Sequence, residues 1–131
     1  MAYKVIKRSE VETAAGSIKQ QAKESVLLSG DWKDKYAVAV VVADHNMGTA
    51  EVHEKSVDTW RVLSGSAKFI LGGKLKDPTS SKPGEWRSDV IEGGEEIEVS
   101  EGDVIDVPAG VPHQLDAANS RIELLIVKIN L

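Results

Sequence analysis

The 131-residue sequence contains no cysteine. This absence excludes a disulfide framework, a zinc site built from thiolates and a cysteine nucleophile, and it is consistent with a reducing compartment. Any metal site in this chain must therefore be made from nitrogen and oxygen ligands.

The sequence also lacks a long apolar run and a basic surface. No segment approaches the roughly 20 apolar residues that a membrane span needs, and the stretch MAYKVIKRSEVE has no apolar core of a secretory signal. The formal net charge is -5, and lysine and arginine are scattered along the chain, which argues against a nucleic-acid-binding face. We therefore expect a cytoplasmic protein that binds neither a membrane nor a nucleic acid.

Short apolar runs dominate the chain from Tyr36 onward. These runs are YAVAVVVAD, RVLSGSAKFILGG, DVIEGGEEIEVSEGDVIDVPAG and IELLIVKIN. Glycine, proline, asparagine and aspartate separate them at roughly 8–12-residue spacing, which is typical of an antiparallel sandwich or barrel. The sequence predicts one all-β domain over residues 36–131, with residues 1–35 as an N-terminal segment that packs on it.

Two segments carry other local signals. In the stretch GSIKQQAKESVLLSG, residues 16–30, Ser17 can cap a segment in which Ile18, Ala22 and Val26 fall at helical spacing, which predicts a short helix. Residues 72–89 contain two prolines and a cluster of serine, threonine and lysine. This composition predicts an exposed hairpin loop that forms a rim or lid.

The stretch EGDVIDVPAGVPHQL, residues 101–115, is tightly punctuated. Gly110 frees the backbone to bend, whereas Pro108 and Pro112 fix φ and stiffen the approach to His113. A rigidly aimed imidazole suits a metal site or an acid–base site. The alternative is a corner between strands in which His113 is simply hydrogen-bonded.

The spacing of these residues resembles the second motif of the cupin superfamily, G-x5-P-x-G-x2-H-x3-N. Gly102, Pro108, Gly110 and His113 occupy the first four motif positions, and Ala117 stands where the family has asparagine. The match predicts that the first cupin motif, G-x5-H-x-H-x3,4-E-x6-G, lies upstream and ends at a glycine.

An altered form of that first motif ends at Gly65. The chain reads E-x-H-x4-D-x6-G, with Glu51 at the first histidine position, His53 at the second and Asp58 at the glutamate position. His45 stands where the family has its leading glycine. The two motifs together resemble a small single-domain cupin with a modified first motif.

The resemblance implies an all-β jelly-roll, a conical double-stranded β-barrel, with a site inside its wider mouth, and the short N-terminal helix predicted above lies outside the matched part. Cupins with intact motifs bind one divalent metal ion through three histidines and one glutamate. This chain would offer His53, His113, Glu51 and Asp58, a set that suits iron, manganese, nickel or zinc. Cupins commonly pair through their sheets, so the resemblance also implies a homodimer.

Strand alternation assigns further roles at this site. Glu51 and His53 face the same side of an extended strand, and Trp60 shares a face with Asp58, which predicts Trp60 as a wall of the substrate pocket. Either carboxylate can ligate metal or be left free as a general base. His45, in the turn-like stretch DHNMG, is either a loop residue or a proton-transfer group at the rim.

Three functions fit these residues. The first is a metal-dependent enzyme of the dioxygenase, isomerase or lyase type that acts on a small oxygenated organic molecule. The second is a cupin that binds a small molecule, such as a sugar or an organic acid, without turnover. The third is a structural cupin that binds nothing, and the fold alone does not separate the three.

Overall fold

Strands make up most of the protein. A computed structural model describes residues 3–18 and 20–131. Its elements are α1 (Arg8–Gly16), β1 (Lys23–Gly30), β2 (Tyr36–Met47), β3 (Ala50–His53), β4 (Ser56–Leu71), β5 (Lys74–Leu75), β6 (Thr79–Lys82), β7 (Glu85–Ser88), β8 (Ile91–Glu92), β9 (Glu95–Ser100), β10 (Val104–Val107) and β11 (His113–Asn130). The all-β prediction with one short N-terminal helix is confirmed.

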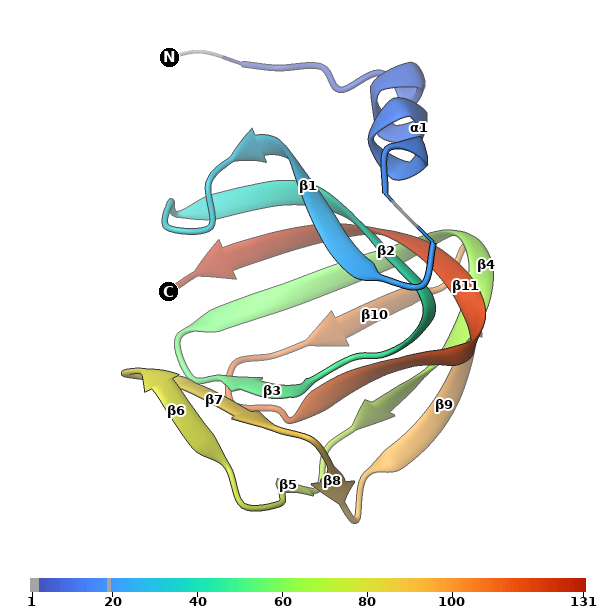
Figure 1. Cartoon of the computed structure of the whole chain (residues 1–131). Coiled ribbons are helices and arrows are strands. Elements are labelled where there is room, and N and C mark those ends of the chain that lie inside the picture. Colours follow the sequence, from blue (N-terminus) through green and yellow to red (C-terminus); the bar gives the residue numbers. More distant parts are fainter. Residues whose placement is uncertain (1–2, 19) are drawn as a thin grey trace.

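Nine of the strands form one sheet that curls around an apolar interior (Figure 1). One path through this sheet runs β1-β2-β11-β3-β7-β6, and β4 pairs with β9, β10 and β11. Strands β5 and β8 form a separate two-stranded sheet. Because the path begins at β1 and ends at β6, the sheet of the described residues curls without closing into a full hydrogen-bonded barrel.

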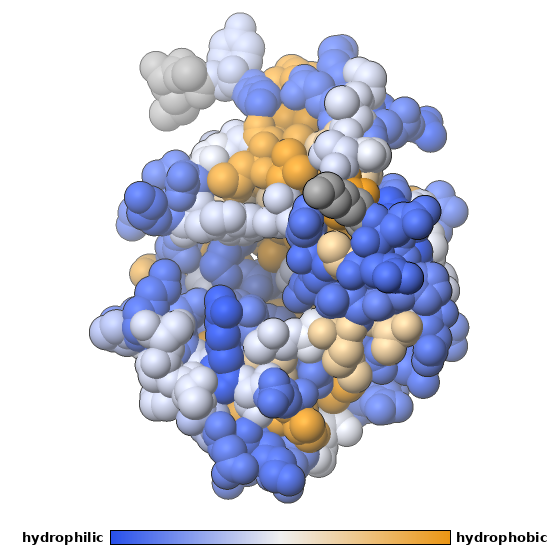
Figure 2. Space-filling view, in the orientation of Figure 1, coloured by the Kyte–Doolittle hydropathy of each residue, from blue (hydrophilic) through white to orange (hydrophobic). Residues whose placement is uncertain are grey.

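Strand β2 is apolar on both faces because both faces are covered. Ala39, Val41 and Ala43 belong to the interior cluster, which also contains the aromatic rings of the core. Val40 and Val42 point the other way and pack with α1 in a second cluster. Figure 2 shows a hydrophobic area where α1 lies over the sheet. A doubly covered strand loses the polar–apolar alternation of an exposed one.

The helix lies upstream of its predicted position. Helix α1 directs Val11, Ala14 and Ala15 at the outer face of the sheet, which is the spacing of one helical face. The prediction of a helix over residues 16–30 is wrong in place. Ser17, expected as the first cap, follows the end of α1, where its hydroxyl donates to the carbonyl of Ala14 at 2.7 Å; Lys19 lies outside the described residues.

Residues 23–30 are strand β1 and not helix. They pair antiparallel with β2 from Lys23↔Ala43 to Gly30↔Ala37. This pairing satisfies the backbone hydrogen bonds of the segment. The spacing of three apolar residues gives too weak a helical preference to override it. The sheet therefore begins within residues 1–35. The division of the chain into an N-terminal segment and a β domain at residue 36 stays a prediction.

The segment 72–89 forms a hairpin, as its composition predicts. Strands β6 and β7 pair with each other, and β7 also pairs with β3. The side chains of β6 are exposed, whereas those of β7 are partly buried. This second pairing brings β7 against the strand that carries Glu51 and His53.

Gly65 lies where the long strands β4 and β11 pass closest. Its φ is +78°, and a Cβ placed there would lie 2.1 Å from the carbonyl oxygen of Arg121. The pairing of β4 with β11 shifts register between Asp116 and Ile122, beside this contact. The closing glycine of the first motif thus permits a close backbone approach that no side chain allows.

We expect Gly65→Ala to destabilise the fold strongly. A residue other than glycine at positive φ costs about 1–3 kcal/mol, and the clash with Arg121 adds to that cost. Gly102→Ala is the matched control, since Gly102 has φ +92° and a Cβ added there would meet nothing within 4 Å. Urea unfolding of both variants measures the difference, and equal losses would contradict the close-contact explanation.

Candidate metal centre

Strand pairing brings the two motif regions together. Glu51 and His53 lie on β3, and the first residue of β11, His113, pairs directly with Glu51. The amide of Gly110 donates to the carbonyl of His53 at 2.8 Å. The punctuated turn before β11 is therefore fixed on the strand that carries the other imidazole, as its prolines and glycine predict.

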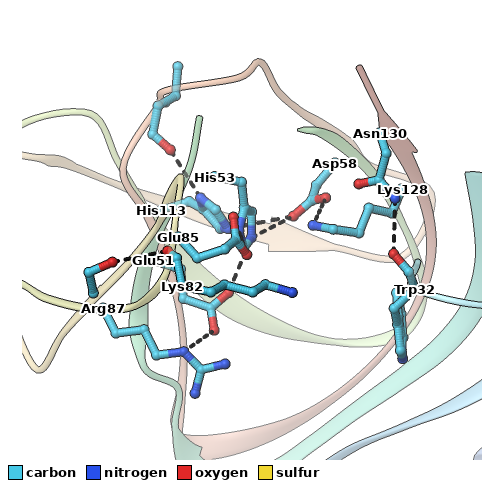
Figure 3. A network of polar contacts seen from close by, with 12 residues as sticks. Trp32, Glu51, His53, Asp58, Lys82, Glu85, Arg87, His113, Lys128 and Asn130 are labelled. Atoms are coloured by element: carbon cyan, nitrogen blue, oxygen red, sulfur yellow. Dashed lines mark hydrogen bonds and ion pairs between the residues drawn. The ribbon is translucent and has the colours of Figure 1, made fainter. Parts of the chain in front are cut away.

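The side chains of the two motifs converge on one point (Figure 3). One ligand atom from each of Glu51, His53 and His113 lies within 4.8 Å of the other two. The Nε2 atom of His53 is 3.2 Å from Glu51 Oε2 and 3.3 Å from Asp58 Oδ2. His113 Nε2 is 3.6 Å from the same Asp58 oxygen. The structure thus brings together all four residues that the motifs predict.

Asp58 has a different environment from the other three. Its Oδ1 atom accepts a hydrogen bond from Lys128 Nζ at 2.9 Å, while its Oδ2 atom faces the two imidazoles. The side chain is almost fully buried, with 3% exposed. Asp58 is therefore shared between an ammonium group and the cluster.

Both histidines present the same nitrogen to the cluster. His53 Nδ1 lies 2.8 Å from Glu85 Oε1, and His113 Nδ1 lies 3.0 Å from the carbonyl oxygen of Val111. A carbonyl or carboxylate oxygen accepts a hydrogen bond from Nδ1–H, so a neutral imidazole held in this way carries its lone pair on Nε2. Metal-binding histidines are oriented by contacts of this type.

Burial and the neighbouring charges shift the pKa values of the cluster in opposite directions. Burial opposes the charge of His53, but Asp58 and Glu51 outweigh it and raise the pKa of His53 to about 9. Burial also opposes ionisation of the two carboxyls, yet His53 at both of them, and Lys128 at Asp58, lower the pKa of Glu51 and of Asp58 to about 2. The carboxylates are thus ionised at neutral pH.

The pKa of His113 shifts in the opposite direction to that of His53, because neighbouring negative charges do not outweigh the effect of its burial. Desolvation lowers the pKa of His113, and the positive charge of His53 acts in the same direction. The two rings lie with centroids 5.0 Å apart. A neutral imidazole therefore stands beside a protonated one in the metal-free protein.

The cluster lies in the wall of a cavity of about 640 Å³. Apolar side chains form its inner part, and Trp60 is among them, as predicted. Trp60 and Phe69 pack with ring centroids 5.8 Å apart. Charged side chains surround the outer part of the cavity, and Figure 2 shows a hollow edged by hydrophilic residues in the middle of the face turned toward the viewer. A cavity of this size accommodates a small organic molecule.

His45 is not part of the cluster. Its Nδ1 atom lies 2.6 Å from Asp44 Oδ1, and Asp44 is also bound by Arg121 Nη1 at 3.1 Å. The side chain of His45 is 58% exposed and is not among those that line the cavity. The positive φ of +46° at His45 turns the chain away at this point. The structure does not support the predicted proton-transfer role.

Three residues of the site escaped sequence analysis. Glu85 comes from the segment read as a loop, and no local signal links it to His53. Lys128 shares a face of β11 with Ile126, so strand alternation could have placed it in the interior. Lys23, which also lines the cavity, falls in the segment wrongly predicted as helix.

Solved structures of known fold resemble this arrangement of strands. The cupin domain of Cnp3 from Schizosaccharomyces pombe matches with a TM-score of 0.61 and 11% sequence identity over 89% of this chain and 67% of that one. The chain has the cupin fold. An uncharacterized protein with a double-stranded beta-helix domain from Klebsiella pneumoniae matches with a TM-score of 0.65 and 15% identity, over 98% of this chain and 91% of its own.

The cupin fold is also shared with an enzyme. DMSP lyase DddQ from Ruegeria pomeroyi matches with a TM-score of 0.59 and 18% identity over 82% of this chain. The present chain spans 47% of that lyase, about half its length. No protein-family model and no curated protein matches the sequence. None of the helical residues described here forms a segment long and apolar enough to cross a membrane.

We expect the chelator-treated protein to lose stability as the pH rises toward 9. The folded state raises the pKa of His53 from 6.5 to about 9, so its stabilising contribution is complete below pH 6.5 and is lost as the pH passes 9. Between pH 7.5 and 9.5 the loss is on the order of 2 kcal/mol. Urea unfolding at these two pH values measures it.

His53→Gln is the control for this pH dependence. The variant has no imidazole to titrate, so its free energy of unfolding should change much less over the same interval. An equal decline in the variant would show that other groups, and not His53, cause the pH dependence.

Proposed function

We propose that this cupin holds one divalent metal ion at Glu51, His53 and His113 and uses it to convert a small oxygenated organic molecule in the cavity. The observation that supports this most directly is the orientation of the two imidazoles. Each has its Nδ1 atom engaged and its Nε2 atom directed at the same point. Two histidines and one carboxylate form a ligand set that non-haem iron enzymes use.

The spacing of the donor atoms fits an ion of this kind. For metal–ligand bonds of about 2.1 Å, adjacent ligand atoms of a tetrahedral site lie roughly 3.4 Å apart. The distance from His53 Nε2 to Glu51 Oε2 is 3.2 Å, and one ligand atom from each of Glu51, His53 and His113 lies within 4.8 Å of the other two. The donor set suits iron, manganese, nickel or zinc, the four ions that the sequence favours.

The ion would act as a Lewis acid that polarises an oxygen atom of the bound molecule. Asp58 supplies a carboxylate on the same side, and its Oδ2 atom, which faces the two imidazoles, is the atom that would accept a proton from the bound molecule. Lys128 holds the other oxygen of Asp58 and so fixes the direction of the free one. We assign Asp58 the role of general base and Trp60 that of an apolar wall for the substrate.

The fold itself is compatible with enzymes and with binding proteins. DddQ shows that a lyase uses this fold, but the fold carries many chemistries. The lyase, isomerase or dioxygenase type is therefore proposed from the site, and a sugar-binding or organic-acid-binding cupin is the alternative. Homodimer formation and a cytoplasmic location also stay predictions.

We expect purified protein to bind about one divalent ion per chain and to lose it when either imidazole is removed. Metal analysis after growth with iron, manganese, nickel and zinc, without a histidine tag, measures the content. His53→Ala and His113→Ala should each lower the content to near zero, because each removes a direct ligand.

His45→Ala is the matched control, since it removes the third histidine outside the cavity. This variant should keep its metal. Circular dichroism confirms that each variant is folded. A folded wild-type protein that takes up none of the four ions would refute the metal site, and so would metal loss in His45→Ala alone.

We expect the metal-loaded protein to turn over a small oxygenated molecule. Oxygen consumption detects dioxygenase activity, and proton NMR of pooled hydroxy, oxo and carboxylic acids detects isomerase or lyase products. Asp58→Asn should lower turnover at least 100-fold while the protein still binds a ligand, because the general base is lost. Binding with no metal-dependent turnover by the wild-type protein would favour the non-catalytic alternative.

A further inference from the structure

The amino group of Lys23 lies in the cavity without an ionic partner. Lys23 lines the cavity together with the metal cluster and Arg87. Among residues 3–18 and 20–131, the ion pairs within 4.0 Å include Lys128 with Asp58 but none with Lys23. Of these two lysines, only Lys128 is neutralised by the protein itself.

The surrounding backbone leaves room for this side chain. Lys23 pairs with Ala43 across β1 and β2, and Ala43 belongs to the interior cluster, so Lys23 faces inward. A Cβ on Gly48 would lie 3.1 Å from Lys23 Nζ and 2.8 Å from the carbonyl of Leu115. Ala43, which pairs with Lys23, and Gly48, which lies next to the amine, are both small. They leave the space through which the Lys23 side chain reaches the cavity.

The charges around Lys23 favour an anion. Glu51 is the acidic neighbour that acts most strongly on Lys23, but its Oε2 atom is engaged with His53. Arg87 also lines the cavity, and its positive charge repels that of Lys23. Arg87 is 60% exposed and lies 3.9 Å from Glu51 Oε1, which is a loose contact. Lys23 and Arg87 therefore both line the cavity, and no carboxylate of the described residues lies within ion-pair distance of Lys23.

We propose that Lys23 is the residue that selects the substrate class, by binding a carboxylate group of a small organic acid, with Arg87 as its second cation. The inference rests on the proposed function, because the other oxygen group of the same acid would lie at the metal centre. An ammonium group and a guanidinium group together bind a carboxylate through charge-assisted hydrogen bonds. This assigns the cavity to acids rather than to neutral sugars.

The energetics of Lys23 agree with this role. Burial lowers the pKa of Lys23, because the charged amine has lost water without a compensating ion pair. A bound carboxylate restores that missing interaction. The desolvated amine thus binds an anion more strongly than an exposed lysine does.

Calorimetric titration of the metal-loaded protein with malonate and succinate tests the proposal. Malonamide and succinamide are the neutral controls of the same shape. At least one dicarboxylate should bind the wild-type protein, and Lys23→Met should weaken that binding about 10-fold or more, as expected for a lost charge-assisted hydrogen bond. Lys23→Arg should retain most of the affinity, and metal content should be unchanged in every variant.

Lys82→Met is the matched lysine control, since Lys82 lines the mouth of the cavity but its side chain is exposed. It should bind the dicarboxylate within about 3-fold of wild type, because exposed charges are screened. The proposal is overturned if Lys23→Met binds as tightly as wild type, if the diamides bind as tightly as the acids, or if neither acid binds.

The same titration without metal separates this inference from the proposed function. If the wild-type protein takes up no metal but still binds a dicarboxylate through Lys23, the metal centre is refuted and the anion site stands. If metal binds normally and Lys23→Met has no effect, the anion site is refuted and the metal centre stands.

Discussion

The register of β11 is the constraint on which the site depends. Its first residue, His113, pairs with Glu51 of β3, and the rest of the strand pairs with β2 and β4. Side chains on a strand alternate between the two faces, so a shift of one residue would turn His113 out of the cavity. The close passage of Gly65 past Arg121 keeps β4 and β11 in this register.

The site is charged, and its charges are balanced by specific neighbours. Three carboxylates contact His53, and Lys128 neutralises part of that negative charge at Asp58. Buried charges are tolerated only when they are paired and hydrogen-bonded. The cluster therefore holds together before any ion enters, and an incoming cation would replace the proton of His53 rather than meet an unpaired set of carboxylates.

The cavity is lined by charges of both signs. Glu51 and Asp58 make the region around the imidazoles suited to a cation, whereas Lys23 and Arg87 make the neighbouring region suited to an anion. Such a division orients a molecule that carries one metal-binding oxygen group and one carboxylate. Strand β1 supplies Lys23 and the hairpin supplies Arg87, so the anion site that we propose draws on elements outside the two motifs.

The sequence by itself determined the strand content and the two motifs, because alternation, β-branched runs and glycine–proline spacing are local signals. The resemblance of the motifs to those of cupins predicted that Glu51, His53, Asp58 and His113 lie together, and the structure brings these side chains close to one another. Only the tertiary structure decided that residues 23–30 are a strand, that Glu85 orients His53 and that His45 lies elsewhere. The first depends on the pairing of β1 with β2, and the second on the pairing of β7 with β3. The spacing of residues along the chain does not indicate which strands lie side by side.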